Sequence, residues 1–327
     1  MNPFDEEAYS RSLALLRTCL TAVGYVASPV QIDNYARVWA RDGVITGLAG
    51  LASGELDMID GLRRTLATLS QHAGPHGEIP SNVTLDGQQV SYGSLVGRVD
   101  SLLWYVIGVC AYVQFTGDVS QQVLHASVVE RALFLAGCWE YNNRGLLYTP
   151  IAGDWADEYI QEGYVLYDEL LYMLALRGAG LLYQNETWQV KAARLEHLLI
   201  VNYWPGTRYQ NDPLVYHPHA YRYQIAQQEV GQQEDGVAWQ HLTEAPTMNE
   251  ARYWLPAFSP SGYATYFDGF AHALALLTAL GDDAQYQQVE CYVQSLEQQI
   301  GSALLPAFWP VILPGTVQWE QLLANHL

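Results

Sequence analysis

Acidic residues stand beside Arg and Trp at several points in this sequence. Asp100 follows Arg98 by two residues and precedes Trp104 by four, so Trp104 would lie one helical turn along the same helix side. The run WARDG at 39–43 has a similar composition, and DWADE at 154–158 places three carboxylates around one Trp. A pair of carboxyl groups can cleave a glycosidic bond, because one protonates the leaving oxygen while the other activates water.

Each group also has a structural interpretation. Asp100 opens a strongly apolar segment, so it can serve as a helix N-cap that contributes about 1 kcal/mol. Arg41 and Asp42 can form a salt bridge, and the carboxylates at 154–158 can belong to a solvated surface loop. Crowded carboxylates are costly unless they are solvated, bound to a cation or used to separate pKa values. From chemistry alone, both interpretations stay open.

Other reaction chemistries have less support. The sequence contains no H-E-x-x-H metal motif, no G-x-S-x-G nucleophile turn, no phosphate loop and no dinucleotide fingerprint. We therefore expect no catalytic metal and no cofactor. His217 and His219 flank Pro218, and paired bases of this kind leave a sugar epimerase as one alternative.

Composition points to a neutral partner. The net charge of −19 would repel nucleic acid and anionic membrane surfaces. Half of the residues are apolar, and 23 Tyr and 10 Trp provide flat faces with polar tips that suit sugar rings. We expect a neutral mono- or oligosaccharide as the partner, with no nucleic acid and no membrane.

Cysteine usage indicates a reducing compartment. Cys19, Cys110, Cys138 and Cys291 are widely spaced in apolar stretches, form no C-x-x-C pair and are expected to be buried thiols. The first residues lack the basic and apolar regions of a signal peptide, and no segment is apolar enough to span a membrane. The chain is therefore expected to be cytoplasmic.

Helical periodicity dominates the sequence and predicts an all-α fold. Apolar residues recur at helical spacing over nine segments, namely 5–24, 38–53, 57–72, 99–116, 121–140, 166–183, 187–202, 263–280 and 283–302. These segments come in pairs, in which a Gly- and Ala-rich helix precedes a more amphipathic one. The alternation predicts an (α/α)6 toroid of helical hairpins, formed by residues 1–327 as a single domain. In such a toroid the polar clusters before the inner helices would converge on one mouth.

Six segments resemble, in order, the bacterial amylo-α-1,6-glucosidase-like proteins and the neutral/alkaline invertases, which share the (α/α)6 barrel. The segments are YARVWARDGV, HGEIPSN, GRVDSLLWYVIGVCAYVQFTGD, DWADEYIQEGYVLYDELLYMLALR, YFDGFAHALALLTALG and LLPAFWPVILPG. The resemblance implies that Asp100 is the general acid of an inverting glycoside hydrolase. It also implies that Trp39, Arg41 and Asp42 hold the substrate and that Asp157 is a subsite acid.

Two features depart from this family pattern. The invertases begin one inner helix with Pro-Leu-Glu, whereas Leu166-Tyr167-Asp168 stands here, which puts sucrose specificity in doubt. Relatives continue past LPAFWPVILPG into a His-Asn-Gly-Gly-x-Trp-Pro segment, and this chain ends at Leu327 before any such motif. We therefore expect a C-terminally incomplete toroid that lacks its last hairpin, and a homodimer formed through the open edge.

The second catalytic carboxylate has two candidates. Glu320, beside Trp319, is the only carboxylate in the region that matches the invertase position. Glu250 lies in the aromatic-rich run NEARYW. Each can equally be a surface residue.

The sequence thus predicts a hydrolase of a neutral α-glucoside or gluco-oligosaccharide. A degenerate glycosidase that only binds carbohydrate is the main alternative. The expected substrate-binding residues are Trp39, Arg41, Asp42, Tyr92, Arg98, Trp104, Asp154, Trp155, Asp157, Tyr167 and Asp268.

Overall fold

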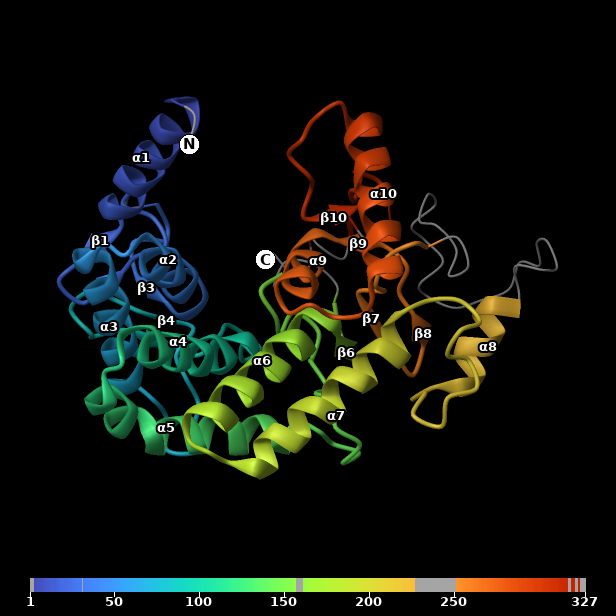
Figure 1. The fold of residues 1–327 in the computed structure, drawn as a ribbon, viewed down its shortest axis with the longest axis horizontal. Helices are drawn as coiled ribbons and strands as arrows, with labels where there is room; N and C mark the ends of the chain where they lie inside the picture. The colour runs from blue at the N-terminus through green and yellow to red at the C-terminus, as the bar shows by residue number, and fades with distance from the viewer. Residues whose placement is uncertain are drawn as a thin grey trace. The chain divides into compact units, whose positions relative to one another are not determined.

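A computed structural model describes residues 3–30, 32–156, 161–226, 251–316, 319–320 and 323. The chain divides into two compact units, the first formed by Met1–Cys138 with Ala175–Gln189 and the second by Trp139–Leu174 with Val190–Leu327. Helices dominate both units, and the strands are only two or three residues long (Figure 1). The expected all-α class is confirmed, while the single domain remains a prediction.

The first unit is built from helices joined by short hairpins. Its elements are α1 (Pro3–Thr18), β1 (Leu20–Thr21), β2 (Gly24–Tyr25), β3 (Val38–Trp39), α2 (Ala40–Ser53), α3 (Leu56–Gln71), β4 (Asn82–Val83), β5 (Val90–Ser91), α4 (Asp100–Thr116) and α5 (Val119–Cys138). The ends of α6 and α7 also belong to it. Strands β3, β4 and β5 form one small antiparallel sheet, and β1 pairs with β2.

The second unit has the same hairpin character. Its elements are β6 (Tyr164–Val165), α6 (Leu166–Leu182), α7 (Glu186–Tyr203), α8 (Pro218–Ala226), β7 (Ala257–Ser259), β8 (Gly262–Tyr263), β9 (Phe267–Asp268), α9 (Gly269–Leu277), α10 (Asp283–Ile300) and β10 (Phe308–Trp309). Strands β6, β7 and β8 form an antiparallel sheet, and β9 pairs with β10.

All nine helical segments expected from the sequence contain a helix, with three corrections. The first helix ends at Thr18 instead of residue 24, because Gly24, at φ +126°, turns the chain into the β1–β2 hairpin. The helix expected over 263–280 begins only at Gly269, since β8 and β9 precede it. Helix α8 was not predicted, although Pro218 at its first position is a common helix start.

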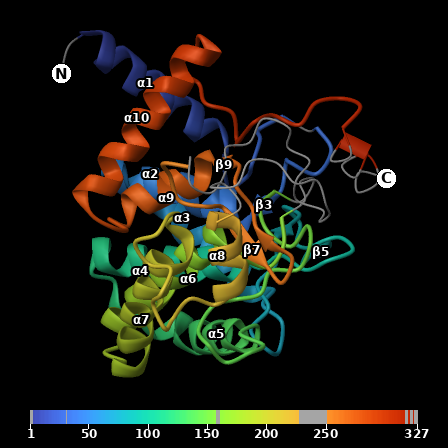
Figure 2. The same cartoon turned by 90° about the vertical axis from the view of Figure 1, so that its right-hand side faces the viewer.

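Close approach of α2, α3 and α4 depends on glycine. A Cβ at Gly47 of α2 would lie 2.5 Å from a Leu62 methyl group of α3, and one at Gly108 of α4 would lie 3.0 Å from both Leu66 and Val44. Because glycine has no side chain, the backbone of α2 packs directly against side chains of α3, and the backbone of α4 packs against side chains of α2 and α3. The three helices lie together in both ribbon views (Figures 1 and 2). This packing fixes where α2 and α4 begin.

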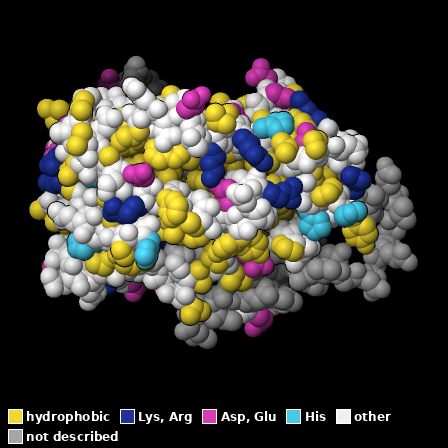
Figure 3. All heavy atoms as spheres, turned by 90° about the horizontal axis from the view of Figure 1, so that it is seen from below, with side chains coloured by type: hydrophobic (Ala, Val, Ile, Leu, Met, Phe, Trp, Pro, Cys, Tyr) yellow, Lys and Arg dark blue, Asp and Glu magenta, His cyan; other side chains and the backbone are white. Residues whose placement is uncertain are grey.

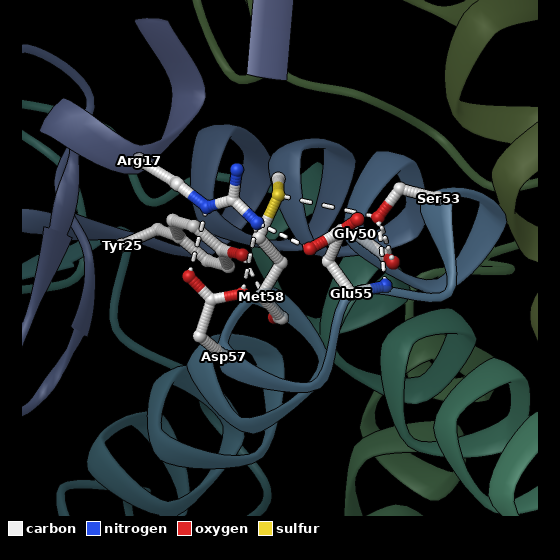
Figure 4. A network of polar contacts seen from close by, with 7 residues as sticks. All are labelled: Arg17, Tyr25, Gly50, Ser53, Glu55, Asp57 and Met58. Carbon is white, nitrogen blue, oxygen red and sulfur yellow. Dashed lines mark hydrogen bonds and ion pairs between the residues drawn. The ribbon is translucent and has the colours of Figure 1, made fainter. Parts of the chain in front are cut away.

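Polar contacts attach α1 to the rest of the first unit (Figure 4). Arg17, in the last turn of α1, donates from Nε to Asp57 over 2.9 Å and from Nη2 to Glu55. Beneath this ion pair, the hydroxyl of buried Tyr25 donates to the Met58 carbonyl over 2.7 Å. Because most α1 side chains are exposed, its attachment relies on exposed ion pairs that salt screens.

Few charged side chains lie on the surface. On the face seen in Figure 3, apolar side chains lie among uncharged groups, with charged side chains sparse between them. This agrees with a sequence in which only 15% of the residues are charged. Within the described residues, no helix combines the length and apolar character that crossing a membrane requires.

Gly47→Ala should destabilise the first unit. The added methyl group would overlap the Leu62 side chain from Cβ to Cδ1, and overpacking of this kind costs about 1–3 kcal/mol. Urea unfolding measures the loss. Gly97→Ala is the matched control, because a Cβ there would meet no atom closer than 3.7 Å. Equal losses in both variants would contradict the packing described for α2 and α3.

Candidate active site

Asp100 is held at the opening of α4 by an arginine from the opening of α2. Arg41 donates from Nη1 to Asp100 Oδ2 over 3.0 Å, and the Asp100 side chain is only 1% exposed. The Arg41 side chain is 23% exposed, so it reaches solvent while its partner is enclosed. Val99 is the N-cap residue, and Asp100 is the first residue of the helix, where the helix dipole favours a negative charge.

Asp42 approaches a different nitrogen of the same guanidinium. Its Oδ2 atom is 3.8 Å from Arg41 Nε, and its side chain is 38% exposed. Burial raises the pKa of the Asp42 carboxyl, the Arg41 charge opposes that rise, and the nearby Asp100 charge adds to it. One arginine therefore pairs with two carboxyl groups of unequal solvent exposure.

Trp39 completes this group from β3. Its indole Nε1 donates to the Asn34 carbonyl over 3.1 Å, and its ring stacks on Tyr35 with ring centres 6.4 Å apart. Tyr35 is half exposed. Trp39 pairs in register with Asn82 of β4, and Asn82 is in turn bonded by Arg37. The group combines an aromatic surface with hydrogen-bonding side chains, which is the chemistry that binds sugars.

Three other residues predicted for this site lie before or within α4. Trp104 is 4% exposed and packs in the core of the first unit. Arg98 is half buried, and its main-chain N–H donates to the Tyr92 carbonyl over 3.0 Å. The Tyr92 hydroxyl donates to the His72 carbonyl at the end of α3 over 2.6 Å. Tyr92 thus helps to anchor the loop that precedes Asp100.

A second polar group lies within the second unit. Asp268 is fully buried and caps α9, since its Oδ1 accepts from the main-chain N–H groups of Phe270 and Ala271 over 2.9 Å each. Gln161 donates to the Tyr266 hydroxyl over 3.0 Å and lies 3.4 Å from the other Asp268 oxygen. Desolvation raises the pKa of the Asp268 carboxyl to about 6.

Asp154 and its neighbour Trp155 lie in the same unit. Asp154 is fully buried, and its Oδ1 accepts from the Ala156 N–H over 2.8 Å. Trp155 stacks on Phe308 with ring centres 5.5 Å apart and meets Tyr167 at 6.2 Å. Tyr167 is fully buried. One face of the Trp155 ring is therefore covered by protein.

Helix α6 carries two further buried acids. Asp168 accepts from the Thr149 hydroxyl over 2.7 Å, and Glu169 beside it has no exposed surface. Desolvation, and then the Asp168 charge, raise the pKa of Glu169 well above its ordinary value. Nearby, Glu140 accepts from the Tyr172 hydroxyl over 2.9 Å and pairs with Lys191. Asp168 and Glu169 both lie in the interior of the second unit.

The remaining candidates divide by position. Glu320 belongs to the second unit and is exposed, whereas Glu250 and Asp157 lie outside the described residues. His217 accepts from the Ala220 N–H in the first turn of α8, and His219 is exposed. Among the residues that the structure describes, no group of three His, Cys, Asp or Glu side chains is arranged to hold a metal ion.

The cysteine prediction needs a partial correction. All four cysteines are free thiols, but only Cys110 is buried, where desolvation raises its pKa to about 12. Cys138 and Cys291 are exposed and Cys19 is partly exposed. Helix periodicity placed them in helices or at helix ends, yet it did not show that two of them face solvent.

The fold is shared with solved glycosidases. A rhamnosidase from Klebsiella oxytoca with rhamnose bound has a TM-score of 0.58 and 14% identity over 88% of this chain and 46% of its own. A GH78 family rhamnosidase of Bacillus sp. GL1 has a TM-score of 0.57 and 16% identity over 87% of this chain and 25% of its own. The chain therefore spans less than half the length of either enzyme.

These likenesses confirm the (α/α)6 class that the hairpin pattern predicted. Because both identities are far below those that accompany shared activity, they establish the fold alone. No family model matches the sequence, and no curated protein matches it either.

Some residues of the site were not singled out from the sequence. Arg37 and Asn82 lie beside Trp39, and Gln161 and Tyr266 lie beside Asp268. All four fall within or next to the segments that carry the family resemblance. Their partners depend on strand register and on contacts between distant loops, so only the structure identifies them.

The stability of the second unit should respond to pH through two opposed groups. Asp268 has a pKa raised to about 6, so between pH 4 and 6 the folded chain binds more protons there and stability falls as pH rises. Burial lowers the pKa of His272 to about 4, so the folded chain binds fewer protons there and stability rises with pH over the same window. His272 Nε2 accepts from the Trp254 N–H, which a protonated ring cannot do.

Asp268→Asn, which keeps the capping oxygen, should therefore make stability rise more steeply from pH 4 to 6. The shift of the Asp268 pKa corresponds to a contribution of roughly 3 kcal/mol to the free energy of unfolding. In His272→Gln only the Asp268 contribution remains, so the free energy of unfolding should fall as the pH rises from 4 to 6. Urea midpoints measured from pH 4 to 7 test this. Identical pH dependence in the two variants and the parent would show that neither group titrates within the window.

Proposed function

We propose that this chain is an inverting glycoside hydrolase that acts on a neutral α-glucoside or gluco-oligosaccharide, with Asp100 as its general acid. The observation that supports it most is the buried Asp100 carboxyl, held by Arg41 at the opening of α4 next to Trp39 and Asp42. The (α/α)6 fold shared with two rhamnosidases supports the reaction class.

The arrangement suggests how the acid is made available. A general acid must carry its proton when the glycosidic oxygen arrives. A sugar diol can accept the Arg41 N–H groups in a bidentate manner, and it would then replace Asp100 as their partner. Asp42, which is more exposed, would accept from a sugar hydroxyl. The substrate itself would in this way prepare Asp100 for proton transfer.

Asp100→Asn should lower kcat by a factor of about 10² to 10⁴ while substrate binding persists, because the amide keeps the shape but cannot donate an acidic proton. The assay covers p-nitrophenyl α-glucoside, isomaltose, maltotriose and sucrose. Asp118→Asn is the matched control, since Asp118 is a partly exposed acid of the same unit that caps the start of α5. Full activity in Asp100→Asn would rule out the proposed acid.

The panel also separates other functions. p-Nitrophenyl α-rhamnoside belongs in it, because both similar structures are rhamnosidases. Saturable binding of a sugar with no hydrolysis that depends on Asp100 would favour the carbohydrate-binding alternative. Interconversion of free sugars would instead favour the epimerase, with His217 and His219 as its bases.

The water-activating carboxylate is proposed to be Glu320 or Glu250. Removing the correct one should lower kcat about as much as removing the acid, and the other should have little effect. Glu320→Gln and Glu250→Gln are compared by kcat, and nuclear magnetic resonance of the first-formed product reports whether the anomeric configuration is inverted. Retention of configuration, or full activity in both variants, would contradict this assignment.

A cytoplasmic location and a homodimer belong to the same proposal. Four free thiols suit a reducing compartment. The dimer remains a prediction from the sequence alone.

A further inference from the structure

A polar hollow lies on the surface of the first unit. Its lining includes Arg37, which precedes Trp39 in the sequence, whereas Arg41 follows Trp39. The hollow encloses about 410 Å³, within the range of roughly 300–1,000 Å³ that small-molecule sites occupy. Its lining residues come from the loop before β3 and from the β4–β5 turn, namely Asp33, Ala36, Arg37, Thr84, Leu85, Asp86 and Gln89. No role was assigned to these residues from the sequence.

The hollow and Trp39 share one face of the β3–β4–β5 sheet. Trp39 pairs with Asn82, and Asn82 pairs with Ser91, so these side chains project to the same side. Val38 and Val83 project to the other side and are fully buried. The face that carries Trp39, Asn82 and Ser91, called the outer face here, is thus polar and aromatic, although Asn82 itself is buried. On the opposite face, Val38 and Val83 belong to the core and Val90 is exposed.

Arg37 and Gln89 extend this outer face into the hollow. Arg37 donates from Nη1 to Asn82 over 3.2 Å and from Nη2 to Gln89 over 3.0 Å. These bonds hold the guanidinium across two strands. A guanidinium carries five N–H donors, so the two bonds use only part of its capacity.

Asp86 supplies acceptors from the opposite wall. Its Oδ1 accepts from the Thr84 hydroxyl over 2.6 Å and from the Gln88 N–H over 3.0 Å, which fixes the turn. Asp33 adds a second exposed carboxylate. The Thr84 hydrogen bond lowers the pKa of the Asp86 carboxyl, so it is ionised at neutral pH.

The charged groups that line the hollow indicate which kind of ligand it can bind. Two carboxylates would repel an anion, and Arg37 would repel a cation. Donors on one wall and acceptors on the other match hydroxyl groups, which both donate and accept. The stacked, partly exposed Tyr35–Trp39 pair supplies an adjoining apolar surface on which a sugar ring can lie.

We propose that this hollow, together with the outer face of the β3–β4–β5 sheet, is an additional subsite that binds further sugar units of a neutral oligosaccharide. Trp39 then lies between the hollow and the Arg41–Asp100 pair, so that one extended glycan contacts both. This inference rests on the proposed function and narrows it, because the chain would prefer oligosaccharides to simple glycosides.

The test measures how binding depends on ligand length. Dissociation constants for methyl α-glucoside, maltotriose and maltohexaose are measured by titration calorimetry in Asp100→Asn, which prevents turnover. The longest ligand should bind at least tenfold more tightly than the monosaccharide glycoside. Adding Arg37→Met or Gln89→Ala should reduce that preference by about tenfold, as expected when a hydrogen bond to the ligand is lost.

Arg63→Met is the matched control, because Arg63 is a partly exposed arginine of the same unit that pairs with Asp60 on α3. It should leave the length preference unchanged. Thermal unfolding of each variant reports whether the fold is intact.

Two results would overturn the subsite alone. Equal affinity for all three ligands would show that no additional sugar is bound, while leaving the proposed hydrolase in place. A loss that is equal for short and long ligands in Arg37→Met and Gln89→Ala would show that these residues only support the fold. Binding of none of the ligands would instead refute the proposed substrate class and this subsite with it.

Discussion

The ion pair between Arg41 and the buried Asp100 constrains where α2 and α4 of the first unit begin. An isolated carboxylate that is 1% exposed would cost several kcal/mol, so Asp100 requires a charged partner close by. That partner comes from a residue 59 positions away in the sequence. The pair forms only if α2 and α4 begin at the same place, and the glycines between these helices and α3 allow that approach.

In the second unit, neutral groups hold the buried carboxyl of Asp268. The Asp268 carboxyl is bonded by two main-chain N–H groups and approached by Gln161. His272 stays neutral because it accepts from one main-chain group and lies 2.6 Å from the Asp268 carbonyl. Neutral donors stabilise a carboxylate less than a guanidinium does, which agrees with the raised pKa of Asp268. The two units therefore provide buried acids in different electrostatic settings.

Much of the fold was predictable because helices carry a strong periodic signal. The hairpins α2–α3 and α4–α5 followed from apolar spacing and from Gly54 and Gly117, which end α2 and α4 in a left-handed conformation. The short strands were not predictable, because two residues cannot show alternation and their pairing is set by tertiary contacts.

The candidate site was predictable in part. The residue types around Asp100 and Trp39 drew attention to both segments, whereas Asp268, expected to bind substrate, is the N-cap of α9. Which carboxylate Arg41 would bind was not evident, since Asp42 is its neighbour in sequence whereas Asp100 is 3.0 Å away only through helix packing. The hollow beside Arg37 was likewise hidden, because it depends on the register of β3, β4 and β5.

A crystal structure of the Asp100→Asn variant with a bound gluco-oligosaccharide would test the central claim most directly. We predict that the glycosidic oxygen lies within about 3 Å of the residue 100 side chain, and that Arg41 contacts sugar hydroxyls. A sugar bound elsewhere, with Arg41 still directed at residue 100 and no glycosidic oxygen near it, would contradict the assignment of Asp100 as the acid.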